Sequence, residues 1–345
     1  MPDMPEEKPL DAVTIGNAIV DIIARADDAF ISEQGMTKSA MNLIDSERSS
    51  SLYDAIGPAM EVSGGSAANT AAGIASLGGS AGYIGKISSD MLGRVFSHDI
   101  RAAGVRFDTP PLENGPATAC SIILVTPDSQ RTMNTYLGAC INLVPEDIDP
   151  VLISQARYVY LEGYLFDAPN GPACFARAAE AARDSATKVA LSLSDAWCVE
   201  RHHEALSGFI ANHTDLLIGN AAEMEALVGA DGETGLRRLG ELVEEAVITS
   251  GAAGSTSIGA DGSHHVDADS SVTVIDTTGA GDLYAAGYLF GRSRGMQRAE
   301  AAAIGTMAAT EIISHIGARP QQPLDKMLAA MANGQLSDGR WSDDR

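Results

Sequence analysis

The chain has 345 residues, of which 45% are hydrophobic and 20% are charged, so it is long enough to form one large domain or a domain with a small appendage. Its formal net charge of −23 argues against a nucleic-acid-binding protein, because binding to phosphates demands Lys and Arg. The four cysteines stand far apart without a Cys-x-x-Cys pair, which indicates free thiols in a reducing cytosol and neither a zinc site nor a disulfide framework.

No targeting or membrane-spanning segment is recognisable. Residues 1–9 are acidic and proline-rich, without the basic and apolar regions of a signal peptide. No apolar run approaches the ~20 residues that span a bilayer. We therefore expect a cytoplasmic protein without membrane partners.

The first third of the chain alternates between strand-like and helix-like stretches. Strands are expected at 12–19 and 83–87, and helices at 49–56, 67–77 and 91–103. Residues 22–44 are mixed and contain short β-like pieces, and residues 105–144 hold strands at 117–125 and 131–136 around a turn. These two segments predict a small excursion from the main sheet.

From residue 158 the alternation is regular. Strands at 158–161, 189–193, 216–218 and 246–249 are separated by helices at 172–185, 201–210, 222–228 and 235–243. This order predicts a doubly wound α/β fold, with a mostly parallel sheet covered by helices on both faces. Ligands of such sheets bind at the carboxyl ends of the strands. The polar tail, 334–345, is expected to be frayed.

The most informative stretch joins an apolar run to a helix. Val272, Val274 and Ile275 resemble the end of a buried strand, and a helix follows from Leu283. Between them, Gly279-Ala280-Gly281 lets the backbone approach a ligand, and the free N–H groups of a helix start favour anions. Asp282 beside such a corner is either an N-cap or a base that takes a proton from an attacking hydroxyl.

Two motifs carry a family resemblance. Residues 276–282, Asp-Thr-Thr-Gly-Ala-Gly-Asp, resemble the C-terminal signature of the ribokinase-like (pfkB-type) sugar and nucleoside kinases, and residues 64–71 resemble the N-terminal Gly-Gly motif of that family. The resemblance covers about residues 10–325. It implies a single ribokinase-like domain over 1–345, with a small β lid from about 22–44 and 105–144.

The resemblance also implies roles for individual residues. Asp282 would be the base, and the amides of Gly279, Ala280 and Gly281 would hold the transferring phosphoryl group. Residues that would bind the acceptor are Asp21, Gly64, Gly65 and Asn69, since a carboxylate and an amide suit a vicinal diol. Two further residues are less specific candidates for binding the acceptor. Arg131 would contact the substrate or a phosphate, or it is an exposed charge on a strand. Ribokinase-like relatives bind the sugar with a Glu at the position of Glu162, but nucleoside kinases need not.

ATP and Mg²⁺ are the implied co-substrate and cofactor. Asn220 and Glu223 match the Asn-x-x-Glu motif that helps to place magnesium and phosphates, although they also suit an N-cap with an acidic first turn. A predicted strand is followed by Thr249, Gly251 and Gly254. These residues form either an ordinary turn or the loop that receives the nucleotide in the family. No Walker A motif occurs in the chain.

A potassium site is a further implication. Many relatives bind potassium behind the glycine amides, at positions that match Asp276, Thr278, Ile312, His315 and Gly317. A buried Asp276 would want a partner, and the alternative is that it only bonds the amides of its own turn. The seven histidines form no ligand cluster in the sequence, and His202-His203 and His264-His265 suit solvated positions in a helix and a loop.

The sequence therefore predicts an ATP-dependent kinase acting on a primary hydroxyl, as a monomer or homodimer. Residues 16–21 and 118–138 are most similar to adenosine kinases, which suggests conversion of adenosine to AMP. Ribokinase, fructokinase and 2-keto-3-deoxygluconate kinase activities are alternatives. A non-catalytic regulator that binds a sugar or nucleoside is a rival of another class, and it would not need Asp282 as a base. A nicotinamide dehydrogenase is excluded by the lack of Gly-x-Gly-x-x-Gly after the first strand.

Overall fold

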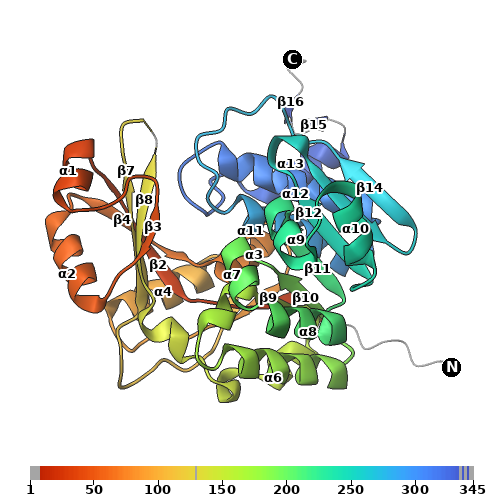
Figure 1. Cartoon of the computed structure of the whole chain (residues 1–345), viewed down its shortest axis with the longest axis horizontal. Helices are drawn as coiled ribbons and strands as arrows, with labels where there is room; N and C mark the ends of the chain where they lie inside the picture. The colour runs from red at the N-terminus through yellow and green to blue at the C-terminus, as the bar shows by residue number, and fades with distance from the viewer. Residues whose placement is uncertain (1–7, 129, 334–335, 338–339, 342–345) are drawn as a thin grey trace.

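A computed structural model describes residues 8–128, 130–333, 336–337 and 340–341. Its described part is built around a nine-stranded sheet in the order β14-β13-β12-β11-β10-β9-β1-β5-β6 (Figure 1). Each pair of neighbouring strands from β12 to β6 is parallel. The pairs β12–β13 and β13–β14 are antiparallel. The strands are β1 (Leu10–Ile15), β5 (Ala81–Ile84), β6 (Arg106–Phe107), β9 (Ala156–Glu162), β10 (Lys188–Ser192), β11 (Leu216–Asn220), β12 (Glu245–Thr249), β13 (Ser255–Gly259) and β14 (Gly262–Val266).

Helices cover both faces of this large sheet because its strands are apolar on both sides. Alternate residues enter different cores: Ala12 packs in one and Val13 in the other. One face is covered by α3 (Ser66–Ser76), α4 (Met91–Ala102), α11 (Ala280–Ser293) and α12 (Arg298–Ile313), with α13 (Leu324–Ala332) outside them. The other carries α5 (Pro150–Ser154), α6 (Gly171–Asp184), α7 (Ala196–Arg201), α8 (His203–His213), α9 (Ala221–Val228) and α10 (Gly232–Gly240).

A second, five-stranded sheet, here called the small sheet, stands beside the main body in the order β3-β8-β7-β2-β4. Its strands are β2 (Ile19–Arg25), β3 (Met41–Leu43), β4 (Ala59–Gly64), β7 (Ala119–Val125) and β8 (Arg131–Tyr136). Helices α1 (Asp28–Glu33) and α2 (Ser46–Ala55) cover the face turned away from the main body, where Ile31 and Leu52 pack on Val20 and Ile22 (Figure 1). The opposite face looks toward the main body.

The predicted fold class is confirmed, with a large mostly parallel sheet, helices on both faces and a second small sheet. Four of the small-sheet strands come from the two segments expected to leave the main sheet, and β4 is an addition from between them. Among the described residues, no helix combines the length and apolar character that crossing a bilayer requires. Most of the 334–345 tail lies outside the described residues.

Two local predictions are wrong. Val272 to Ile275 form no strand, and Val274 and Ile275 are 57% and 43% exposed, because this segment crosses the surface as a loop. His264 and His265 lie in β14, an edge strand, instead of in a loop. The edge position explains the polar composition, since in the described part of the chain one side of β14 has no neighbouring strand.

Candidate active site

The start of α11 forms the expected corner at the carboxyl-terminal edge of the large sheet. Gly279 precedes the helix with φ +77°, a conformation that favours glycine. The N–H of Ala280 donates to the Thr277 carbonyl at 3.2 Å, so it is not free as expected. Within the described residues, the N–H groups of Gly279, Gly281 and Asp282 have no such acceptor. The corner therefore offers donors from 279, 281 and 282 to an anion.

Asp282 is oriented by helix α3, which belongs to the N-terminal third of the chain. Ser66 Oγ donates to Asp282 Oδ1 at 2.6 Å, and Asn69 Nδ2 donates to Oδ2 at 2.8 Å. The N-cap of α11 is Gly279, so Asp282 does not cap its own helix. Burial raises the pKa of Asp282, and the bonds from Ser66 and Asn69 oppose that rise. The arrangement is that of a fixed carboxylate with an elevated proton affinity.

Asp21 reaches the same region from β2 of the small sheet. Burial raises its pKa to about 7, Arg319 and Arg131 lower it, and the charge of Asp282 raises it further. A Cβ at Gly64 would lie 2.3 Å from Asp21 Oδ2, so the glycine makes room for the carboxylate. Asp21, on the small sheet, and Asp282, on the main body, thus lie near enough for their charges to interact.

Gly65 and Glu162 both lie against Asn17, in the loop after β1. Gly65 has φ +92°, and a Cβ there would lie 2.0 Å from the Asn17 carbonyl oxygen. Glu162 is 1% exposed and accepts hydrogen bonds from the Ala67 N–H and from Asn17 Nδ2, both at 2.9 Å. Burial raises the pKa of Glu162 to about 7, and these bonds lower it. Glu162 here anchors the start of α3 to the loop after β1, and its contact with the acceptor stays a prediction.

Asn69 also differs from expectation. Its amide nitrogen is used by Asp282, and the side chain is 4% exposed. Its Oδ1 atom is buried without a hydrogen-bond partner. In this conformation Asn69 orients a carboxylate instead of presenting itself to a diol.

Arg131 and Asp276 form an ion pair between the small sheet and the main body. Arg131 Nη2 lies 2.5 Å from Asp276 Oδ1, and their side chains are 16% and 1% exposed. Asp276 also accepts from the N–H groups of Thr278 and Gly317, at 2.6 and 3.0 Å. Arg131 is thus neither an exposed strand charge nor a free phosphate ligand here. Asp276 bonds its own turn, as the alternative held, and it has a cationic partner as well.

The predicted potassium ligands are main-chain carbonyls together with Asp276, so the side-chain contacts of Ile312 and His315 do not test this prediction. The Ile312 side chain is fully buried in the core under α13. His315 Nε2 lies 3.1 Å from Glu311 Oε1. Three of the five predicted positions are in contact, because the N–H groups of Thr278 and Gly317 donate to the Asp276 carboxylate.

The predicted nucleotide residues lie at the ends of β11 and β12. Asn220 and Glu223 form a reciprocal capping box on α9, with the Glu223 N–H donating to Asn220 Oδ1 at 3.0 Å. Burial raises the pKa of Glu223 to about 7, the Asn220 backbone lowers it and Asp195 raises it. Thr249 Oγ1 donates to the Gly219 carbonyl at 3.4 Å, which ties the two strand ends together.

Gly251 and Gly254 differ in their surroundings. Gly251 has φ +55° and open space around it, as a ligand-receiving loop requires. Gly254 has φ +85°, and a Cβ would lie 2.1 Å from the Val266 carbonyl oxygen, so Gly254 is needed for the turn into β13.

Arg319 is the residue that the sequence analysis missed. It follows α12 in a loop and donates to the carbonyls of Ser63 and Ala68 at 2.9 and 2.8 Å. Its position after the predicted potassium segment, in Gly317-Ala318-Arg319-Pro320, was the available signal.

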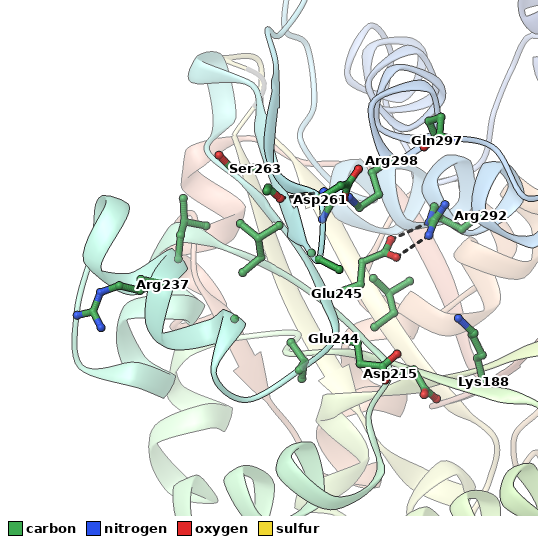
Figure 2. Close-up of a pocket in the computed structure, with 18 of the residues that line it drawn as sticks. Lys188, Asp215, Arg237, Glu244, Glu245, Asp261, Ser263, Arg292, Gln297 and Arg298 are labelled. Atoms are coloured by element: carbon green, nitrogen blue, oxygen red, sulfur yellow. Dashed lines mark hydrogen bonds and ion pairs between the residues drawn. The ribbon is translucent and has the colours of Figure 1, made fainter.

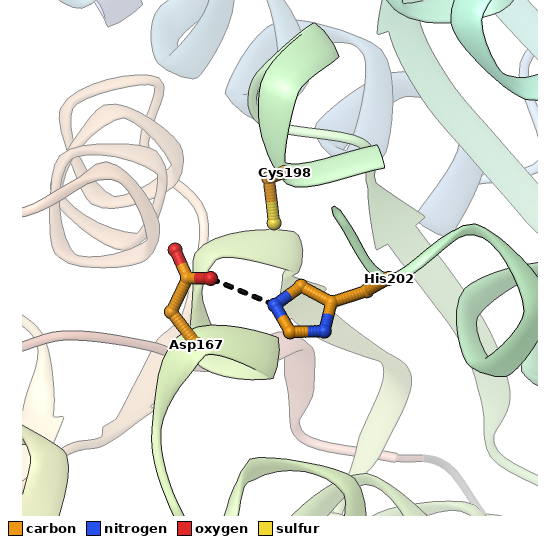
Figure 3. Close-up of side chains that lie close together, drawn as sticks. All are labelled: Asp167, Cys198 and His202. Atoms are coloured by element: carbon orange, nitrogen blue, oxygen red, sulfur yellow. Dashed lines mark hydrogen bonds and ion pairs between the residues drawn. The ribbon is translucent and has the colours of Figure 1, made fainter. Parts of the chain in front are cut away.

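Two other polar groupings lie apart from this site. Asp167, Cys198 and His202 converge in Figure 3, yet Arg201 donates to both oxygens of Asp167, and burial raises the pKa of Cys198 to about 12. This is an ion-pair network with a neutral thiol. A cavity of about 1180 Å³ lies at the opposite edge of the sheet, where Arg292 forms a fork on Glu245 (Figure 2).

Comparisons with known proteins agree with this geometry. Residues 56–325 match the model of the pfkB family carbohydrate kinases. The crystal structure of adenosine kinase from Sinorhizobium meliloti is similar, with 45% identity, a TM-score of 0.87, and coverage of 94% of this chain and 99% of that one. A probable sugar kinase from Rhizobium etli has 41% identity and a TM-score of 0.87, over 95% of this chain and 100% of that one. A 5-dehydro-2-deoxygluconokinase from Photobacterium profundum is 26% identical over 94% of this chain and 95% of its own length.

The family match and the fold are those of an ATP-dependent kinase. The chain belongs to the pfkB family of carbohydrate kinases.

Proposed function

We propose that this kinase transfers the γ-phosphoryl group of ATP to the 5′-hydroxyl of adenosine. Asp282 takes the proton of the hydroxyl as its oxygen attacks phosphorus, and ADP leaves with the bonding electrons of the broken bond. The N–H groups at the start of α11 stabilise the charge on the transferring group. Asp21 accepts hydrogen bonds from the ribose hydroxyls, and the small sheet acts as the lid.

The observation that carries a nucleoside acceptor is an apolar row on the lid face that also bears Asp21. Cross-strand pairs align the five side chains Met60, Ile23, Ile123, Met133 and Met41. Side chains two residues apart share a face, so this row lies about 6.6 Å along the sheet from Asp21. Met41 and Met60, on the two edge strands, are 53% and 56% exposed, whereas Ile123 at the centre of the row is 4% exposed, so apolar surface is uncovered at the two ends of the row. A purine fits that surface while its ribose reaches Asp21, whereas a small sugar would leave the row uncovered.

Magnesium and ATP fit the groups at the ends of β11 and β12. Glu223 is a buried carboxylate beside Asp195, and no cationic side chain pairs with it among the described residues. Such a group suits a hydrated divalent cation, which would offset the charge of the phosphate oxygens. Asn220, Glu223, Thr249 and the open loop at Gly251 would hold the nucleotide.

Potassium beside Asp276 stays a prediction with a weaker basis. A buried Asp276 was expected to need a cation as its partner, and Arg131 supplies that partner. Exchange of the protein into a buffer with only a bulky organic cation, followed by addition of potassium or lithium, tests the site. We also place the enzyme in the cytoplasm, because all four cysteines are buried free thiols.

The second candidate is a kinase for a sugar or sugar acid, favoured by the curated relatives that phosphorylate 5-dehydro-2-deoxygluconate according to their name. A panel of adenosine, ribose, fructose, 2-keto-3-deoxygluconate and 5-dehydro-2-deoxygluconate, assayed for ADP formation, separates the two. We expect the highest kcat/KM with adenosine. A tenfold preference for any of the others refutes the nucleoside acceptor. Binding of adenosine without ADP formation would instead favour the non-catalytic regulator.

A further inference from the structure

Arg319 bridges two parts of the chain on either side of the Gly64-Gly65 pair. Its Nε donates to the Ser63 carbonyl at 2.9 Å, and its Nη2 donates to Ser63 Oγ at 2.9 Å. Its Nη1 donates to the Ala68 carbonyl at 2.8 Å. Ser63 belongs to β4 of the small sheet and Ala68 to α3 of the main body. One guanidinium therefore fixes the strand before the glycines relative to the helix after them.

A second contact makes the bridge more rigid. Asp99 Oδ2, from α4, accepts from the N–H of Ser63 at 2.8 Å and from Ser63 Oγ at 2.5 Å. Ser63 is 1% exposed, so both of its polar groups depend on these partners. The end of β4 is thus held from α4 and from the loop after α12.

Arg319 lies near both carboxylates of the proposed reaction, because its partners Ser63 and Ala68 adjoin Gly64, which lies against Asp21, and Asn69, which donates to Asp282. All three of the hydrogen bonds that Arg319 donates go to carbonyl or hydroxyl oxygens, and among the described residues it forms no direct ion pair. It nevertheless lowers the pKa of both Asp21 and Asp282, while Asp99, Asp21 and Asp282 raise its own pKa against the effect of burial. The groups facing Asp282 are Asp21 from β2, Tyr160 and Glu162 from β9, Tyr164 from the turn after β9, and Arg319. Arg319 is the one cation named among them.

We propose that Arg319 is a positioning residue that sets the angle of the lid at Gly64-Gly65 and, through its charge, lets Asp21 and Asp282 be ionised side by side. The inference rests on the proposed kinase reaction. Two neighbouring carboxylates repel each other, and a fixed cation near both lowers that penalty without occupying their oxygens. Asp21 then stays free for the acceptor and Asp282 for the proton.

The test compares Arg319→Gln, Arg319→Lys and Arg101→Gln in the whole enzyme. Arg101 is the matched control, because its Nε and Nη2 also donate to a carbonyl, that of Phe107, at 3.0 and 2.6 Å. In Arg319→Gln we expect the acidic limb of the kcat profile to move up by about one pH unit, at the lower end of the effect of a neighbouring charge. We expect kcat/KM to fall about 100-fold, as for a misplaced catalytic group. Arg319→Lys keeps the charge, so its limb stays at the wild-type pH while kcat/KM still falls.

Three outcomes overturn the inference. If the acidic limb of the kcat–pH profile stays at the wild-type pH in Arg319→Gln, Arg319 has only a packing role. The same follows if kcat/KM falls equally in Arg319→Gln and Arg101→Gln. If Arg319→Gln does not fold, Arg319→Lys decides, since wild-type kcat/KM in that variant contradicts the positioning role. Failure of the wild-type enzyme to phosphorylate any acceptor of the panel refutes the proposed function, which is a separate result.

Discussion

Arg131 and Asp276 meet across the boundary between the small sheet and the main body, with Arg131 Nη2 2.5 Å from Asp276 Oδ1. The two residues are 145 positions apart, and the Asp276 side chain is almost fully buried. The same carboxylate holds the turn that leads into Gly279 through the Thr278 N–H. The small sheet is thereby connected to the turn that precedes α11.

Replacing Arg131 by Met should leave Asp276 buried without its cation. Breaking a buried pair by removing one partner costs about 3–5 kcal/mol, so we expect a lower Tm. We also expect potassium to raise the Tm of this variant more than that of the wild type, measured by thermal unfolding in potassium chloride and in tetramethylammonium chloride. Arg106→Met is the control, because Arg106 pairs with Asp108 at the exposed surface. A variant as stable as the wild type would show that the pair contributes little.

Asp282→Asn keeps the size of the side chain and removes the proposed base. Loss of general-base catalysis lowers kcat by roughly 10²–10⁴, and KM should change little because the reacting hydroxyl is the one group of the acceptor that Asp282 is proposed to contact. Steady-state kinetics with adenosine and ATP measure both constants. Asp184→Asn, at an exposed position, controls for loss of one negative charge. Near-normal kcat in Asp282→Asn would remove the base from the proposed reaction.

The stability of the ligand-free protein should fall as the pH rises through about 7. Asp21, Glu162 and Glu223 have pKa values raised from about 4 to about 7 by burial, so each binds a proton more tightly folded than unfolded. Their stabilisation is complete below the unfolded pKa and is lost as the pH rises through the folded pKa.

Chemical unfolding at pH 5.5 and pH 8 measures this difference. In Glu162→Gln the difference should shrink, because one of the three groups no longer titrates, whereas Glu204→Gln at the surface should leave it unchanged. Equal stability of the wild type at both pH values would contradict the raised pKa values.

Gly65→Ala should be strongly destabilising. The residue has φ +92°, and a Cβ would lie 2.0 Å from the backbone oxygen of Asn17, which cannot move like a flexible side chain. We expect a lower Tm and weaker adenosine binding by calorimetry. Gly208→Ala is the matched control, since it lies in α8 with nothing within 4 Å and should be neutral or slightly stabilising. Equal behaviour of the two variants would show that the backbone at Gly65 adapts.

Much of the architecture could be predicted because hydrophobic periodicity is local. The strands predicted at 189–193 and 246–249 are β10 and β12, displaced by one residue or fewer at most ends. The hairpin of β13 and β14 was missed because an exposed edge lacks an apolar pattern. The opposite error occurred at Val274 and Ile275, whose apolar side chains stay exposed beside the corner.

Side-chain partners were the harder part. The motifs identified Asp282 and Asp21, but nothing local to Arg319 indicates that it bonds to Ser63, 256 residues earlier. Glu162 was expected to face a ligand because it ends a strand, and its burial by Ala67 and Asn17 depends on the packing of three separate segments. Such contacts follow from the assembled fold.

The bond from Ser66 to Asp282 spans 216 positions of the chain, and it has a consequence during synthesis. On the ribosome, the N-terminal segments emerge and begin to fold well before α11 exists. The helix that orients the carboxylate therefore waits for most of translation, and the loop carrying Arg319 arrives later still. Polypeptides released early should accumulate without phosphotransferase activity, so activity would report the completion of each chain.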